Sequence, residues 1–181
     1  MKKIFDLTNF SLIVFLIVFF IPTNAFAKCN IGFKLGENIK QVEEKFGTSI
    51  FLAEKFSVIE APIEEVCPRE KLGYATVEFY FLNDELAAYK IVVDHYEDTP
   101  EDEKLLLFEY VKKNYGDITD AKRPKHWRGF KFWDKKNEIA VYKKMDFHGM
   151  LDEVLYISSE KYNETFTVYE SGEGEPVDKN D

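Results

Sequence analysis

The sequence lacks the short motifs by which common enzyme classes are recognised. It contains no G-x-S-x-G nucleophile turn, no H-E-x-x-H zinc pair and no glycine-rich phosphate loop. Histidine is scarce, because only His95, His126 and His148 are present, and they are scattered along the chain. His95 and Glu97 can share a strand face, but two ligands are too few for a metal site. No catalytic residue, metal site or cofactor is therefore predicted.

Long apolar runs are absent except near the start of the chain. Lys2 and Lys3 precede the run LIVFLIVFFI at 12–21, and Ala25 and Ala27 supply the small residues that a signal peptidase needs. This core of about ten residues is shorter than the roughly 20 that span a bilayer. Residues 1–27 are therefore predicted to be a signal peptide, and the protein to be periplasmic or secreted. An uncleaved anchor is the alternative, because residues 7–27 carry no charge.

Cysteine is also scarce, with Cys29 and Cys67 alone in the chain. Two cysteines in an exported protein usually form one disulfide, and that pairing is predicted here. A lipid-bearing Cys29 is disfavoured, because cleavage just before it would put Lys28 where a small residue is needed. Cys67 as a nucleophile is disfavoured too, since no histidine or surrounding motif supports it.

Basic residues are in deficit, with 24 Lys and Arg against 33 Asp and Glu and a formal net charge of −9. Nucleic-acid binding depends on an excess of positive charge, so this balance argues against it. Acidic residues are concentrated at 164–181, together with glycine and proline. That segment is predicted to be a disordered acidic tail.

Two similar phrases, NDELAAYK at 83–90 and KNEIAVYK at 136–143, suggest an internal duplication. Each follows a strand-like run of alternating apolar and polar residues and a turn, as the return strand of a hairpin would. The first hairpin runs out at 77–81 and returns at 86–93. The second runs out at 129–133 and returns at 139–143, and a further strand follows at 154–158. Chance similarity between two amphipathic hairpins is the alternative.

A helix is predicted before each hairpin. In the first, Ile39, Val42 and Phe46 share one face, Asn38 is the N-cap, and Gly47 ends the helix. The second is expected to begin at Thr99 as its cap, with proline at the first helical position, and to end at residue 116. The sequence therefore predicts an α+β protein of tandem helix-plus-antiparallel-sheet units at 28–98 and 99–163.

The first unit resembles a known family. Gly36, Val42 and Gly47, followed by Thr48 and later by a Phe-rich hairpin, are similar to the SmpA/OmlA-like fold of the outer-membrane barrel-assembly lipoprotein. Related helix-plus-sheet units occur in tandem in secreted β-lactamase inhibitor proteins. The resemblance implies a family whose members act mainly by binding other proteins.

One segment, KRPKHWRGFKFW at 122–133, is basic and aromatic in an otherwise acidic chain. Tryptophan and arginine dominate binding hot spots, because they bury large areas and donate hydrogen bonds in fixed geometry. Trp127, Arg128, Lys131 and Trp133 are therefore the predicted binding residues. The alternative interpretation packs one face of this strand against a helix and leaves its basic residues in solvent.

Together, the absence of catalytic motifs, the composition and the family resemblance predict a function. The expected protein is an exported, non-enzymatic protein-binding module of the bacterial cell envelope that acts through a sheet face. Its expected partner is another envelope or secreted protein, with no nucleic acid and no stable membrane span after cleavage. A small exported hydrolase or metal-dependent enzyme without a linear motif is the alternative. A structural envelope protein, tethered if the signal is kept, is a further one.

Overall fold

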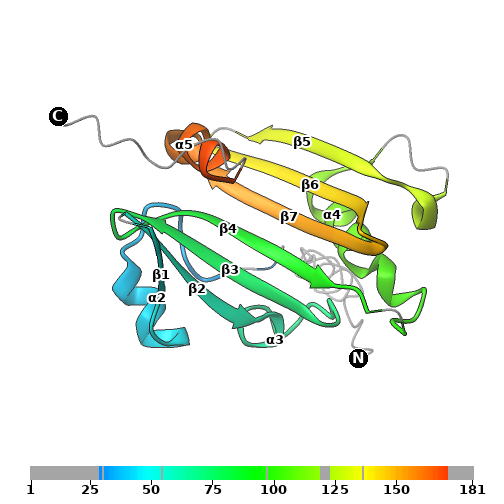
Figure 1. The fold of residues 1–181 in the computed structure, drawn as a ribbon, viewed down its shortest axis with the longest axis horizontal. Coiled ribbons are helices and arrows are strands. Elements are labelled where there is room, and N and C mark those ends of the chain that lie inside the picture. The colour runs from blue at the N-terminus through cyan, green and yellow to red at the C-terminus, as the bar shows by residue number, and fades with distance from the viewer. Residues whose placement is uncertain are drawn as a thin grey trace, which may run out of the picture.

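A single antiparallel sheet organises the protein (Figure 1). The structure, a computed structural model, describes residues 29, 31–53, 55–96, 98–118, 123–135 and 137–170. The sheet has seven strands in the order β1-β2-β3-β4-β7-β6-β5. The strands are β1 (Ile50–Ala53), β2 (Phe56–Pro62), β3 (Ala75–Leu82), β4 (Glu85–Asp94), β5 (Gly129–Lys135), β6 (Glu138–Phe147) and β7 (Met150–Ser159).

Helices lie on both faces of this sheet but cover them unequally. The helices are α2 (Ile39–Phe46), α3 (Ile63–Val66), α4 (Leu106–Tyr115) and α5 (Glu160–Glu170), with short 3₁₀ turns η1 (Glu103–Leu105) and η2 (Pro124–His126). Phe46 of α2 stacks on Phe79, and Phe108 of α4 meets Tyr142 edge to face. Because strand pairing puts Phe79 and Tyr142 on one face, α2 and α4 cover the same side, here called the helix face.

The opposite side of the sheet, here called the open face, has only partial cover. Tyr162 of α5 packs there with Phe56, Tyr80 and Ala88, at the end of the sheet where β4 begins. The remainder of this face, over β5, β6 and β7, meets no other described helix. The main core therefore lies between the sheet and the α2–α4 layer, because alternate residues of each strand point into it.

Most elements predicted from the sequence are confirmed. Both hairpins are present, and the duplicated phrases begin at their turns, where Asn83, Asp84 and Asn137 have positive φ values. Asn38 caps α2 by accepting a hydrogen bond from the Lys40 backbone N–H at 3.1 Å. Cys29 and Cys67 are paired as a disulfide, with Cα atoms 5.6 Å apart. The α+β class follows directly from these elements.

The second helix differs from its prediction at its start. α4 begins at Leu106, after the η1 turn, and not beside Thr99. The Thr99 hydroxyl instead accepts a hydrogen bond from the Tyr96 backbone N–H, so it closes a turn after β4. The acidic residues that follow Thr99 therefore precede the α-helix.

The two ends of the chain are described only in part. α5 runs to Glu170, so a helix occupies the first residues of the segment predicted to be the acidic tail. Residues 171–181 and the predicted signal peptide at 1–27 lie outside the described residues. In the part of the chain that the structure describes, no helix is long and apolar enough to cross a membrane.

Candidate functional site

The two tryptophans of the predicted binding segment lie on the helix face. Trp127 stacks on Tyr142 with ring centroids 5.4 Å apart and planes 9° apart, and it also contacts Phe108 of α4. Trp133 contacts Tyr115 at the end of α4 at 5.6 Å. Both indoles are half-buried against the main core. These contacts match the alternative in which one strand face packs against a helix.

Arg128 and Lys131, the other two predicted binding residues, do not gather with the tryptophans into one exposed patch. Arg128 donates from Nε to Asp146 at 2.9 Å and from Nη1 to the backbone carbonyls of Lys125 and Trp127. Lys131 of β5 is aligned with Tyr142 of β6 in the sheet and is half-buried. The binding role of these four residues stays a prediction.

Two phenylalanines of this segment face solvent, as several of its basic residues do. Phe130 is 74% exposed and Phe132 is 52% exposed, and both lie on the open face. Across the sheet, Phe132 is aligned with Val141 and Tyr156, and Phe130 is aligned with Lys143 and Val154. A hollow of about 640 Å³ runs over these strands.

Charged side chains in this hollow are engaged with one another. Lys143 pairs with Asp152 at 2.6 Å, and the Tyr80 hydroxyl donates to Glu78 at 2.6 Å. Lys90 lies over the Tyr80 ring, with its nitrogen 4.7 Å from the centroid. The floor between them is built from Val92, Val141, Val154, Tyr156 and Phe132. The open face is therefore a largely apolar surface with a neutralised border.

A second distinctive feature is a cluster of polar side chains inside the helix-face core. Glu153 is fully buried, and its Oε2 lies 2.6 Å from His95 Nε2. Its Oε1 accepts a hydrogen bond from the Tyr142 hydroxyl and lies 3.5 Å from Lys144 Nζ. Lys144 is also buried, and its ammonium donates to the Lys104 carbonyl at 2.7 Å. Buried charges of this kind are costly unless they are paired, and here each has a partner.

The surroundings shift the protonation of this cluster in defined directions. Burial raises the pKa of the Tyr142 hydroxyl, and the neighbouring Glu153 carboxylate raises it further, so Tyr142 stays neutral and donates. Burial lowers the pKa of the Lys144 ammonium, while the attraction of Glu153 opposes that change. Removing Glu153 would leave the desolvation of Lys144 uncompensated.

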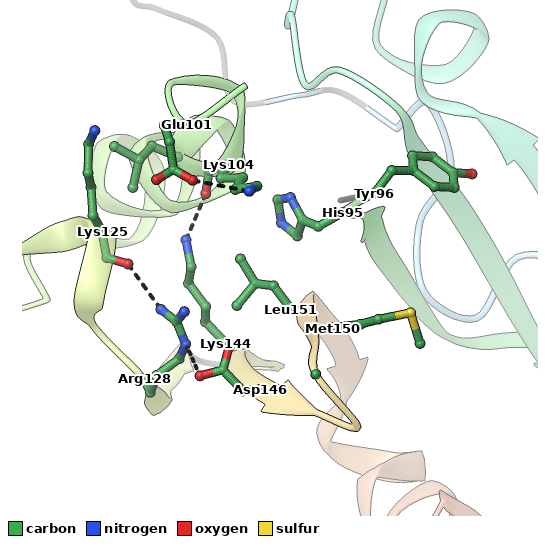
Figure 2. A pocket seen from close by; sticks show the side chains of 12 residues that line it. His95, Tyr96, Glu101, Lys104, Lys125, Arg128, Lys144, Asp146, Met150 and Leu151 are labelled. Atoms are coloured by element: carbon green, nitrogen blue, oxygen red, sulfur yellow. Dashed lines mark hydrogen bonds and ion pairs between the residues drawn. The ribbon is translucent and has the colours of Figure 1, made fainter. Parts of the chain in front are cut away.

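Two members of the cluster, His95 and Lys144, line a cavity of about 220 Å³ (Figure 2). The end of β4, the η1 and η2 turns and the β6–β7 hairpin surround it. None of the twelve described residues that line it is serine, threonine or cysteine. His95 Nδ1 has no hydrogen-bond partner among the described residues, and the atom is buried. The carboxylates that line the cavity, Glu101 and Asp146, are both engaged in ion pairs, with Lys104 and Arg128 respectively.

The sequence contained a signal for part of this cluster. His95 stands out as a rare residue, yet its partner is Glu153 and not Glu97, which lies outside the described residues. Lys144 and Glu153 occupy inward positions of strands whose other inward residues are apolar, such as Tyr142 and Leu155. A charged residue at an inward strand position can be recognised in the sequence. That Lys144 lies opposite Glu153 follows only from the pairing of β6 with β7.

Within the described ranges, no three His, Cys, Asp or Glu side chains lie where they could hold a metal ion together. Comparisons with protein-family models, curated proteins and solved structures found no match to this chain. The resemblance to the SmpA/OmlA-like family accordingly stays a prediction.

Proposed function

We propose that this protein is an exported, non-enzymatic protein-binding module of the bacterial cell envelope that receives its partner on the open face. The observation that carries the proposal is the exposure of Phe130 and Phe132 beside the 640 Å³ hollow. Single exposed apolar residues are ordinary, but a group of them over adjacent strands is typical of an interaction surface. Another envelope or secreted protein is the proposed partner.

The chemistry of the open face suits a protein partner. Interface centres are rich in aromatic residues and poor in free charge, while polar residues form the rim. Phe132, Val141 and Tyr156 form such a centre, and the Lys143–Asp152 pair stands beside it. Because that ion pair is already satisfied, a partner can cover it without leaving a lone buried charge.

The arrangement of the chain supports the same proposal. We infer that two helix-plus-sheet units, at 28–98 and 99–163, join edge to edge where β4 pairs with β7. A single wide sheet then carries one helix-covered side and one side left for contact. The similarity of the first unit to a family of protein-binding modules, together with the predicted signal peptide, suggests export and a binding role.

Capture from an envelope extract tests the proposal. The wild-type protein and a Phe130→Ser, Phe132→Ser variant serve as baits, and we expect a specific partner to be retained at least tenfold less by the variant. A loss of that size follows because each buried aromatic contributes at least about 1 kcal/mol at a hot spot. Quantitative mass spectrometry of the retained proteins, followed by a direct binding measurement on the recovered partner, provides the readout.

The matched control is Phe51→Ser. Phe51 is 70% exposed, but it lies on β1, at the opposite edge of the sheet from β5. This variant should retain the partner as the wild type does. The proposal is contradicted if the Phe130/Phe132 variant keeps its partner, if Phe51→Ser loses it equally, or if the wild type retains nothing specific.

A further inference from the structure

We propose that two copies of this protein join through their β5 strands, so that the two sheets continue into one another across a twofold axis. In the described part of the chain, β5 is hydrogen-bonded to β6 alone and is the outermost strand of the sheet (Figure 1). Such an edge presents unpaired backbone N–H and C=O groups, which are a template for another strand. The dimer does not require the partner proposed above, so it can be tested on the protein alone.

β5 is the better formed of the two edges of the sheet. It has seven residues, and all of them are aligned with β6 without a shift in register. β1, at the other edge, has four residues, and its register with β2 shifts between Phe51 and Ala53. Short edge strands and bulges are features by which proteins prevent edge pairing. Of the two edges, β5 is therefore the one that a second copy can extend regularly.

The side chains of β5 favour a strand as the occupant of this edge. Phe130 is 74% exposed and Phe132 is 52% exposed, and both project from the open face beside the unpaired backbone. Large apolar side chains on an exposed edge strand are typical of a strand that pairs with another chain. Aromatic pairs across neighbouring strands also stabilise an antiparallel sheet.

Symmetry and charge select one register for this pairing. A twofold axis perpendicular to the sheet keeps both open faces on one side, and one residue of β5 then lies opposite its own counterpart. With Lys131 at the axis two ammonium groups face each other, and with Trp133 there Lys131 faces Lys135 of the second copy. Like charges directly opposite one another destabilise a sheet. With Phe132 at the axis, the whole of β5 is paired and no like charges are directly opposite.

The register centred on Phe132 also places complementary side chains opposite each other. The two Phe132 rings meet on the open face as an aromatic pair. On the helix face, Lys131 of each copy lies opposite the half-buried indole of Trp133, as a cation–π contact requires. The Lys135 ammonium lies over Tyr115 of its own chain, 4.4 Å from the ring centroid, and so is already engaged. The strand is therefore complementary to itself.

The dimer would enlarge the surface that the open face offers. Phe132 is the residue of β5 that lines the 640 Å³ hollow. In the dimer, Phe132 of the second copy continues this lining, and the two hollows lie on one surface. A single copy therefore carries only half of the apolar surface that the dimer presents.

Sedimentation velocity of the purified protein over a range of concentrations tests the dimer. We expect a reversible monomer–dimer equilibrium at micromolar concentrations. Lys131→Glu should raise the dimer dissociation constant about tenfold, because two cation–π contacts are lost in each dimer. Lys40→Glu is the charge-matched control, since it alters an exposed lysine of α2, and it should leave the dissociation constant unchanged.

Cysteine substitution tests the register. Phe132→Cys places a thiol directly opposite its counterpart, so oxidation with copper phenanthroline should give covalent dimers on non-reducing gels. The native cysteines are paired with each other and do not compete. In Phe130→Cys the two thiols lie about 14 Å apart along the strands, which is too far for a disulfide. Phe51→Cys exposes a thiol on β1, and neither control should cross-link.

Several results would overturn the dimer. These are a wild type that is monomeric at every concentration, a Lys131→Glu variant that dimerises as the wild type does, and a Phe130→Cys or Phe51→Cys variant that cross-links as fully as Phe132→Cys. The cross-linking comparison holds even if Lys131→Glu disturbs the fold. A monomeric chain that still captures a partner on the open face would refute the dimer and leave the proposed function standing.

Discussion

Replacement of Glu153 with leucine is expected to lower the free energy of unfolding by about 3–5 kcal/mol. Glu153 is fully buried and contacts three polar partners, His95, Tyr142 and Lys144. Leucine would leave the Lys144 ammonium buried without its counter-charge and the Tyr142 hydroxyl without its acceptor. The cost arises mainly from these abandoned partners, because leucine itself fits an apolar environment.

Chemical denaturation followed by far-UV circular dichroism measures this effect, and Asp152→Leu is the matched control. Asp152 precedes Glu153 in β7, but it faces the other side of the sheet and forms a partly exposed ion pair with Lys143. Its loss should change the stability by about 1 kcal/mol or less. Equal effects of the two substitutions would show that the buried cluster has no special energetic role.

A double substitution measures the net contribution of the Lys144–Glu153 ion pair to stability. In Lys144→Met, Glu153→Leu, both charges are removed together, and the variant should recover at least about half of the stability lost in Glu153→Leu. Recovery would mean that the pair itself adds little net stability. A double variant as unstable as Glu153→Leu would instead make Lys144 a structural element.

Local features of the fold could be predicted from the sequence because their causes are local. The alternation of Val77, Phe79 and Phe81 indicates a strand, and the turn at Asn83 and Asp84 indicates where it reverses. Asn38 before an apolar helical face predicts the start of α2. Each of these signals is carried by residues within one or two turns of the element that they define.

The pairing of β4 with β7 has no such local signal. The two strands lie far apart in the chain, and their register, for example Ile91 beside Leu155, depends on the whole sheet. That register decides which charged residues meet, so the contact of His95 with Glu153 could not be derived from sequence spacing. The candidate cavity depends on the same non-local pairing, and for this reason the sequence did not indicate it.

The binding segment shows where strand periodicity stops being informative. Alternation correctly separates Phe130 and Phe132 from Trp127, Lys131 and Trp133. Alternation does not indicate which face of the strand a helix covers. The enrichment of tryptophan in binding hot spots led to the prediction that the tryptophan side is the binding face. The packing of α4 against Trp127 and Trp133 placed that side in the core and left the phenylalanines exposed.

Trp127→Ala is accordingly expected to destabilise the protein by about 3 kcal/mol, while Phe132→Ala should cost less than about 1 kcal/mol. Trp127 stacks on the fully buried Tyr142 and touches Phe108, so truncation leaves a void beside two core aromatics. Phe132 projects from the open face and loses little packing when truncated. Parallel denaturation curves of the two variants provide the comparison.

The same pair of variants decides between the two surfaces on which a partner could bind. A partner that docks on the open face should be lost by Phe132→Ala, which keeps its fold, and retained by Trp127→Ala at temperatures where that variant is still folded. The sequence-based prediction requires the reverse, with Trp127→Ala stable but unable to bind. If the Trp127 indole supports the core by stacking on Tyr142, its removal must lower the stability of the fold. Stability and binding measured on the same variants therefore distinguish the two interpretations.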